Sequence, residues 1–222
     1  MTPYYQAKGI TIYHGDCRTL VLPEKPALVL ADPPYGDDHD TDYTRFTGGL
    51  LRRDGSEVCR YHHAAVAGDQ EDFDPSRLLA LETETILWGA NRYGNRLPTG
   101  SLLIWDKRTP TGSKGVMSDA EVAWWSHGRG VYIFSHTWDG FNRASERGPK
   151  LHGTQKPIAL MRWCLMRAKL APGALVYDPY MGSGPVAKAC KELGYRYIGC
   201  ELVEQYCETT VLGLQQEVME FV

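Results

Sequence analysis

Two short apolar segments of this chain each run directly into a carboxylate and a special turn. Residues 27–31 (Ala-Leu-Val-Leu-Ala) precede Asp32-Pro33-Pro34-Tyr35, and residues 174–177 (Ala-Leu-Val-Tyr) precede Asp178-Pro179-Tyr180-Met181-Gly182-Ser183-Gly184. Short, near-continuous aliphatic runs are typical of strands buried on both faces, which occur in parallel sheets covered by helices. We therefore expect an α/β fold in which two buried strands end in polar turns.

Further short apolar runs alternate with helical stretches along the chain. We expect strands at 10–13, 27–31, 85–88, 102–105, 121–125, 131–134, 174–177 and 195–200, and helices at 76–83, 157–170 and 185–193. This alternation favours a doubly wound, mostly parallel sheet in one domain spanning residues 1–222. The pair 120–125 and 131–135, joined by Gly128-Arg129-Gly130, favours an antiparallel hairpin near one edge.

Residues 36–75 do not follow this pattern. The segment carries acids, arginines, glycines and a histidine pair without helical or strand periodicity. A long stretch of this kind inside a compact domain is typically a functional lid or a disordered loop. Because it follows the Asp-Pro-Pro-Tyr turn directly, we expect a lid.

The composition indicates an ordinary globular protein of the cytoplasm. Of the 222 residues, 43% are hydrophobic and 23% charged, and no stretch approaches the roughly 18 apolar residues of a membrane helix. The N-terminus resembles neither a signal nor a transit peptide. Six cysteines without a CxxC pair favour reduced thiols. Cys59, His62 and His63 lack a clear fourth ligand, so no metal is expected.

The formal net charge of −3 is not typical of a general nucleic-acid binder. The charge is uneven, however, because residues 92–114 carry five cations against Asp106; these are Arg92, Arg96, Lys107, Arg108 and Lys114. A local basic patch on an acidic body is compatible with contact to a polyanion through one face.

The first turn combines groups that suit an amine on a flat ring. Asp32 offers an anionic acceptor, Pro33 and Pro34 offer carbonyls without an N–H on the same residue, and Tyr35 offers a flat aromatic face. Such a set can hold the amino group of a heterocycle while a ring stacks on it.

The second turn has the features of a nucleoside site. Gly182 and Gly184 permit close backbone approach, Pro185 suits the first turn of a helix, and Glu201 ends the next strand, where a carboxylate can take a ribose diol. There is no GxGxxG motif and no P-loop lysine, so a nucleoside without phosphates fits better than a dinucleotide. Lys156, at the start of a helix, opposes the helix dipole, a cost that is understandable if the lysine is needed elsewhere, for example for an anionic ligand group.

Together these motifs resemble the DNA amino-methyltransferases, which use S-adenosylmethionine to make N6-methyladenine or N4-methylcytosine. The order Asp-Pro-Pro-Tyr, then Thr-Gln-Lys-Pro, then Asp-Pro-aromatic-x-Gly-Ser-Gly is the permuted order of the β class. Three further segments also resemble those of this family: Gly15-Asp16, Trp88-Gly89-Ala90-Asn91 and Trp105-Asp106-Lys107. The resemblance implies a Rossmann-like fold with a seven-stranded sheet, of the kind found in restriction–modification enzymes.

The resemblance also assigns roles to residues. Asp32, Pro33, Pro34 and Tyr35 would hold the target base, flipped out of the duplex or on a single strand. The cofactor would be bound by residues of both later motifs and by one early aspartate; these are Asp16, Thr154, Lys156, Asp178, Pro179, Gly182, Ser183, Gly184 and Glu201. Methyl transfer would be a direct in-line displacement onto adenine N6. Arg45, Arg52, Arg53 and Arg60 of the lid would be candidates for phosphate contacts.

Two departures from the family pattern bear on specificity. Pro185 stands where Thr usually follows Gly-Ser-Gly, and only residues 139–151 are available for a recognition region. A homodimer or a specificity partner could compensate. The alternatives are a cytosine-N4 methyltransferase, a protein or RNA amino-methyltransferase, which usually has the reverse motif order, and a non-catalytic nucleic-acid-binding subunit.

Overall fold

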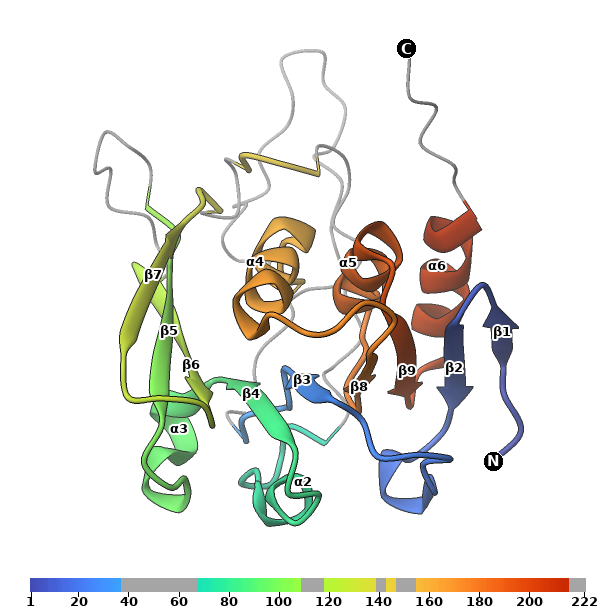
Figure 1. Cartoon of the computed structure of the whole chain (residues 1–222), viewed down its shortest axis with the longest axis horizontal. Helices are drawn as coiled ribbons and strands as arrows, with labels where there is room; N and C mark the ends of the chain where they lie inside the picture. The colour runs from blue at the N-terminus through green and yellow to red at the C-terminus, as the bar shows by residue number, and fades with distance from the viewer. Residues whose placement is uncertain (37–67, 109–117, 139–142, 147–154, 216–222) are drawn as a thin grey trace, which may run out of the picture.

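The computed structural model describes residues 1–36, 68–108, 118–138, 143–146 and 155–215. In this part of the chain a nine-stranded sheet lies between two layers of helices (Figure 1). The strands are β1 (Tyr5–Ala7), β2 (Ile10–His14), β3 (Leu28–Ala31), β4 (Glu84–Trp88), β5 (Ser101–Asp106), β6 (Ala120–Trp125), β7 (Val131–Ser135), β8 (Leu175–Asp178) and β9 (Arg196–Glu201). The helices are α2 (Ser76–Leu79), α3 (Ala90–Tyr93), α4 (Ile158–Ala168), α5 (Pro185–Leu193) and α6 (Glu204–Gln215), with 3-10 turns η1 (Cys17–Thr19) and η2 (Gly94–Arg96).

The strand order is β1-β2-β9-β8-β3-β4-β6-β5-β7. The five strands from β2 to β4 in this order are parallel, β6 is antiparallel to both its neighbours, and β7 is parallel to β5. The expected α/β class with a doubly wound, mostly parallel sheet is thus confirmed, and all eight expected strands are present. An antiparallel hairpin, β1–β2, closes one edge of the sheet.

Two details of the expected sheet differ. The described sheet has nine strands, whereas the resemblance implies seven; β1 is the strand that is not among the eight expected segments. The segments 120–125 and 131–135 do not pair with each other, since β5 lies between them. The burial pattern explains this: Ala123, Trp124 and Trp125 are all buried, as in a central strand, whereas exposed residues alternate along β7, as on an edge.

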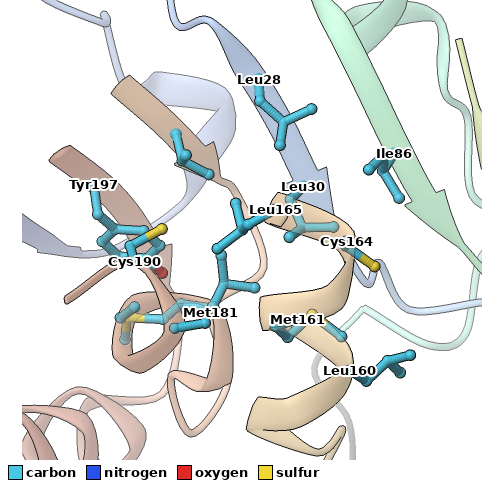
Figure 2. Packing of buried hydrophobic residues seen from close by; sticks show 14 of the residues in the cluster. Leu28, Leu30, Ile86, Leu160, Met161, Cys164, Leu165, Met181, Cys190 and Tyr197 are labelled. Atoms are coloured by element: carbon cyan, nitrogen blue, oxygen red, sulfur yellow. The ribbon is translucent and has the colours of Figure 1, made fainter. Parts of the chain in front are cut away.

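The core has one layer on each face of the sheet, and successive strand residues alternate between them. Leu28 and Leu30 pack with α4, α5 and α6, while Val29 and Ala31 pack with α2, α3 and the η1 region. Figure 2 draws Leu160, Met161, Cys164 and Leu165 of α4, which belong to the same buried cluster as Leu28, Leu30 and Ile86 of the sheet. The aliphatic runs are therefore buried on both faces, as their sequence predicts.

The helix after the second motif begins and ends at glycines. Gly184 is the N-cap of α5 with φ of 74°, Pro185 occupies its first turn, and Gly194 ends it in the left-handed region with φ of 72°. This is the expected helix 185–193. The expected helix 157–170 is α4, which ends where Lys169 turns left-handed with φ of 51°.

Most of the expected lid, residues 37–67, lies outside the described residues, as do Cys59, His62 and His63. Its two flanks lie side by side: a Cβ on Gly36 would meet the Glu71 carbonyl oxygen at 2.8 Å. The cysteines in the described segments are free thiols, and four of these five are buried. No helix in the described part of the chain is long and apolar enough to cross a membrane.

Candidate active site

Four predicted carboxylates lie at the carboxyl ends of four neighbouring parallel strands. Asp16 follows β2, Glu201 ends β9, Asp178 ends β8 and Asp32 follows β3, in the spatial order of these strands. From β8 the chain winds through α5 to β9, whereas from β3 it continues to β4 on the other side. The two motifs therefore flank the topological switch point, where ligands bind in open α/β sheets.

A single cleft of about 1170 Å³ joins the two motifs. Its walls include nine of the predicted site residues, namely Asp16, Asp32, Pro34, Lys156, Asp178, Pro179, Gly182, Ser183 and Glu201. The first and second turns thus face one continuous space, although they are far apart in the sequence. Thr154 lies outside the described residues.

Both oxygens of Asp32 are engaged by predicted site residues. The Tyr35 hydroxyl donates to Oδ1 at 2.5 Å, and the Lys156 ammonium donates to Oδ2 at 2.5 Å. Burial raises the pKa of Asp32, and Lys156 opposes that rise. Lys156 is only 5% exposed, so the anionic group that this lysine meets is the carboxylate of the first motif.

Two neighbours that are remote in sequence fix Tyr35: Asp69 binds its backbone, and Gly89 packs against its ring. The backbone N–H of Tyr35 and that of Gly36 both donate to Oδ1 of Asp69, each at 2.9 Å. The ring packs against Gly89, which has φ of 81°, and a Cβ there would lie 2.1 Å from Cε1 of Tyr35. Only glycine therefore leaves room for the ring at this point.

Lys156 has a second carboxylate partner, Glu121 of β6, which sequence reasoning missed. Oε2 of Glu121 lies 3.1 Å from the Lys156 ammonium, and Oε1 lies 3.0 Å from the ammonium of Lys107. Burial raises the pKa of Glu121, but the two lysines outweigh this effect and hold it below its usual range. A signal was present, since Glu121 is the sole charged residue of an otherwise apolar strand.

Glu201 ties the second motif to the neighbouring strand end. Its Oε2 accepts from the Gly182 N–H at 2.8 Å, and its Oε1 accepts from the Val203 N–H at 2.9 Å. Gly182 has φ of 53°, while a Cβ on Gly184 would meet the Thr210 side chain at 2.3 Å. Gly184 thus makes room for α6, and Gly182 and Ser183 face the cleft.

Asp178, at the start of the second turn, accepts two hydrogen bonds with its side chain. Its Oδ1 accepts from the Tyr180 N–H at 3.2 Å, and its Oδ2 accepts from the hydroxyl of the buried Tyr197 at 3.1 Å. Burial raises the pKa of Asp178 to about 8, although both hydrogen bonds favour the charged form.

Asp16 has a different environment at the far end of the cleft. It caps η1 by accepting from the Arg18 N–H at 2.8 Å, and it pairs with the Arg18 guanidinium at 2.7 Å. These bonds hold the pKa of Asp16 below its usual range, so the carboxylate is ionised in its pair with Arg18.

The expected basic patch over residues 92–114 is not a free cationic surface. Arg96 pairs with Asp72, Lys107 is buried against Glu121, and Arg108 pairs with Asp106. Lys114 lies outside the described residues. Two of the four excess positive charges, on Arg96 and Lys107, are therefore paired with acids from outside the segment, Asp72 and Glu121.

The fold is that of known DNA methyltransferases. The structure of PvuII DNA methyltransferase (cytosine-N4-specific) matches with a TM-score of 0.60 and 14% identity, covering 98% of this chain and 90% of that one. The structure of M1.HpyAVI matches with a TM-score of 0.54 and 19% identity, covering 94% and 100%. At these identities the two likenesses establish the architecture.

Sequence comparison then gives the family. A profile of the N6/N4 methyltransferases, described as "DNA methylase", matches residues 82–212, more than half of the chain. Type II methyltransferase M.HinfI of Haemophilus influenzae is 24% identical over 258 aligned positions, covering 93% of this chain and 68% of that protein. The chain belongs to the N6/N4 DNA methylase family, whose cofactor is S-adenosylmethionine.

The residues present fit this cofactor. The cleft wall combines carboxylates at the ends of β2, β8 and β9 with the glycine turn, a set that suits a cationic, diol-bearing nucleoside. Glu201 uses one lone pair of each oxygen on backbone N–H groups, which leaves acceptor capacity for hydroxyls.

Proposed function

We propose that this protein transfers the methyl group of S-adenosylmethionine to the exocyclic N6 amino group of adenine in DNA. The observation that carries the proposal is the shared cleft: Asp32 and the glycine turn face one space from adjacent parallel strands. The first residue of the tetrapeptide is Asp32, and in the family that this chain resembles an Asp at this position is commoner in enzymes that methylate adenine. This supports adenine as the substrate base.

In this proposal Asp32 and the Pro33 carbonyl each accept one N–H of the target amine. The amine is a poor nucleophile because its lone pair is delocalised into the ring. Two acceptors draw it toward tetrahedral geometry and direct the lone pair into the cleft. Asp32 also stabilises the positive charge that develops on nitrogen, and the methylated ammonium loses its proton afterwards.

Each oxygen of Asp32 has a lone pair left for this task. A carboxylate oxygen accepts more than one hydrogen bond, and the Tyr35 hydroxyl and the Lys156 ammonium take one each. Lys156 favours the ionised form of Asp32. The Tyr35 ring packs against Gly89, Asp69 binds the Tyr35 backbone N–H, and the ring supplies the face on which the extruded base stacks.

The cofactor supplies an electrophilic methyl group on a sulfonium centre. We assign Glu201 to its ribose hydroxyls, Asp16 to the adenine end, and the remaining lining residues of the second motif to the methionine end; these are Asp178, Pro179, Gly182 and Ser183. Gly184 supports the turn through its close approach to Thr210. Lys156 acts through Asp32, and Thr154 remains a prediction from sequence.

Target selection needs more than the short segment 139–151. We propose that a second copy of the chain or a separate specificity subunit contributes to it. Light scattering of the protein with and without a DNA duplex tests the first option. A monomer that methylates one sequence motif by itself contradicts both.

One experiment tests the reaction and its alternatives. The protein is incubated with S-adenosylmethionine carrying a deuterated methyl group and with unmethylated DNA, and the digested nucleosides are analysed by mass spectrometry. We expect deuterated N6-methyladenine. Deuterated N4-methylcytosine would replace adenine by cytosine as substrate, and absence of any methylated base despite cofactor binding would favour a non-catalytic subunit.

A further inference from the structure

Four side chains of alternating charge form a row of ion pairs that begins at Asp32, the candidate catalytic carboxylate. Lys107 contacts Glu121, Glu121 contacts Lys156, and Lys156 contacts Asp32, at 3.0, 3.1 and 2.5 Å. The four residues come from different places in the fold: after β5, on β6, before α4 and after β3. Both lysines are about 5% exposed.

Glu121 and Lys107 are not required to neutralise Asp32 and Lys156. Lys156 and Asp32 already form a neutral pair, and a buried charge pair is costly to desolvate. Glu121 adds a negative charge next to that pair, and Lys107 restores neutrality. Two further charges are therefore desolvated, and the result is that Lys156 has a second carboxylate partner, Glu121.

The geometry shows what the second carboxylate does to Lys156. The ammonium has three protons, and three acceptors surround it: Asp32 at 2.5 Å, Glu121 at 3.1 Å and the Tyr35 hydroxyl oxygen at 3.3 Å. The ammonium donates hydrogen bonds to Asp32 and to the Tyr35 hydroxyl oxygen and forms an ion pair with Glu121, so the lysine is held between two carboxylates. The positive charge of Lys156 is shared between Asp32 and Glu121 and does not act on Asp32 alone.

We propose that Glu121 and Lys107 are positioning residues for methyl transfer: acting through Lys156, they set how tightly this lysine pairs with Asp32, and thereby the strength of Asp32 as an acceptor for the target amine. This inference rests on the proposed function of Asp32. Without Glu121, Lys156 would bind Asp32 more tightly and weaken it as an acceptor. Without Lys107, Glu121 would draw Lys156 away from Asp32.

The two residues act on Asp32 in opposite directions. Among the residues that the structure describes, the titratable groups that interact with Asp32 are Tyr35 from its own turn, Tyr93 of α3, Glu121 of β6, Lys156 before α4 and Asp178 of β8. Among them Glu121 stabilises the protonated form of Asp32, and Lys156 stabilises the ionised form. Lys107 is linked to Asp32 through its ion pair with Glu121, which in turn pairs with Lys156.

The test is the pH dependence of methyl transfer, since protonation of Asp32 should set the acid limb of kcat. In Glu121→Gln, which keeps shape but removes the charge, we expect the acid limb to move to lower pH by about one pH unit, with a lower plateau. In Lys107→Met the limb should move to higher pH. In the double variant, which restores neutrality, it should return close to the wild-type position.

Asp106→Asn is the matched control, because it removes an equal charge next to Lys107 on β5 from a surface pair with Arg108; its acid limb should stay in place. Circular dichroism and cofactor titration establish that each variant is folded. Shifts in the same direction in both single variants, or no shift in Glu121→Gln, overturn the inference. The proposed function fails separately, if the wild-type protein itself transfers no methyl group.

Discussion

Asp32 combines two properties that oppose each other, burial and a negative charge. Burial raises its pKa, and the Lys156 ammonium at 2.5 Å opposes this. The Tyr35 hydroxyl on the other oxygen orients the carboxylate. At the scale of single residues the site is therefore a carboxylate whose two oxygens are each fixed by one donor and each retain acceptor capacity.

Replacing this carboxylate should stop methyl transfer without removing the cofactor site. For Asp32→Ala we expect a loss of at least about 100-fold in kcat, the magnitude typical of losing one electrostatic contact in a transition state. Cofactor affinity, measured by calorimetry, should change by only a few-fold. Asp106→Ala removes a surface aspartate and should retain activity. Near-normal turnover in Asp32→Ala would remove Asp32 from the mechanism.

Gly89 tests whether the position of the Tyr35 ring matters. A Cβ at this residue would overlap the ring at 2.1 Å, so Gly89→Ala should displace Tyr35 and lower kcat at least about tenfold. Gly173 is the matched control: it also has a positive φ, 71°, but a Cβ there meets nothing within 4 Å. Gly173→Ala should cost about 1 kcal/mol of stability with unchanged kcat. Equal activity in the two variants would contradict the role of the ring.

At the scale of elements, Asp69 joins the end of the β3 turn to the far flank of segment 37–67. One carboxylate oxygen accepts two successive backbone N–H groups, those of Tyr35 and Gly36. The Asp69 side chain is buried, so its loss would leave buried donors without this partner. The position of Tyr35 therefore depends on Asp69, which belongs to the described end of the expected lid, residues 36–75.

Asp69→Ala should therefore affect both stability and turnover. We expect a loss of about 1–3 kcal/mol in the free energy of unfolding, measured with urea, and a fall in kcat. Ser126→Ala is the control, because the Ser126 hydroxyl oxygen also accepts a backbone N–H, from Thr85, outside the cleft. It should lose stability but keep kcat. Unchanged kcat in a folded Asp69→Ala protein would disprove the coupling.

Sequence patterns predicted elements better than they predicted partners. Each buried strand was visible because its apolar residues are continuous, and α5 was visible from Pro185 and Gly194. The pairing of β6 was wrong, because adjacency in sequence does not reveal that β5 lies between β6 and β7. The contact of Lys156 with Asp32 spans 124 residues, and no local pattern encodes it.

At the scale of the whole molecule, strand order places the permuted motifs side by side. β3, early in the chain, pairs directly with β8, late in the chain, so that Asp32 and Asp178 end neighbouring strands. The cleft then runs past β9 and β2 to Asp16. The resemblance predicted this set of residues, but the buried pairs Glu121–Lys156 and Glu121–Lys107 required the folded sheet.

Asp178 should make the stability of the whole molecule depend on pH. Its pKa is about 8 in the folded protein and near 3.9 in the unfolded chain, so the folded state retains the proton between these values. The contribution of this retained proton to the free energy of unfolding is therefore fully present below about pH 4 and is lost as the pH rises through 8. Asp178→Asn, which mimics the protonated form, should become more stable than wild type by a few kcal/mol as pH rises from 5 to 8.

Urea unfolding of both proteins at pH 5, 6.5 and 8 measures this difference. Glu24→Gln is the control: Arg196 holds the pKa of the exposed Glu24 below its usual range, so that carboxylate stays ionised throughout. Its difference from wild type should not change over this interval. If the advantage of Asp178→Asn is equally independent of pH, Asp178 is ionised in the folded protein, and its hydrogen bonds to Tyr197 and the Tyr180 N–H outweigh its burial.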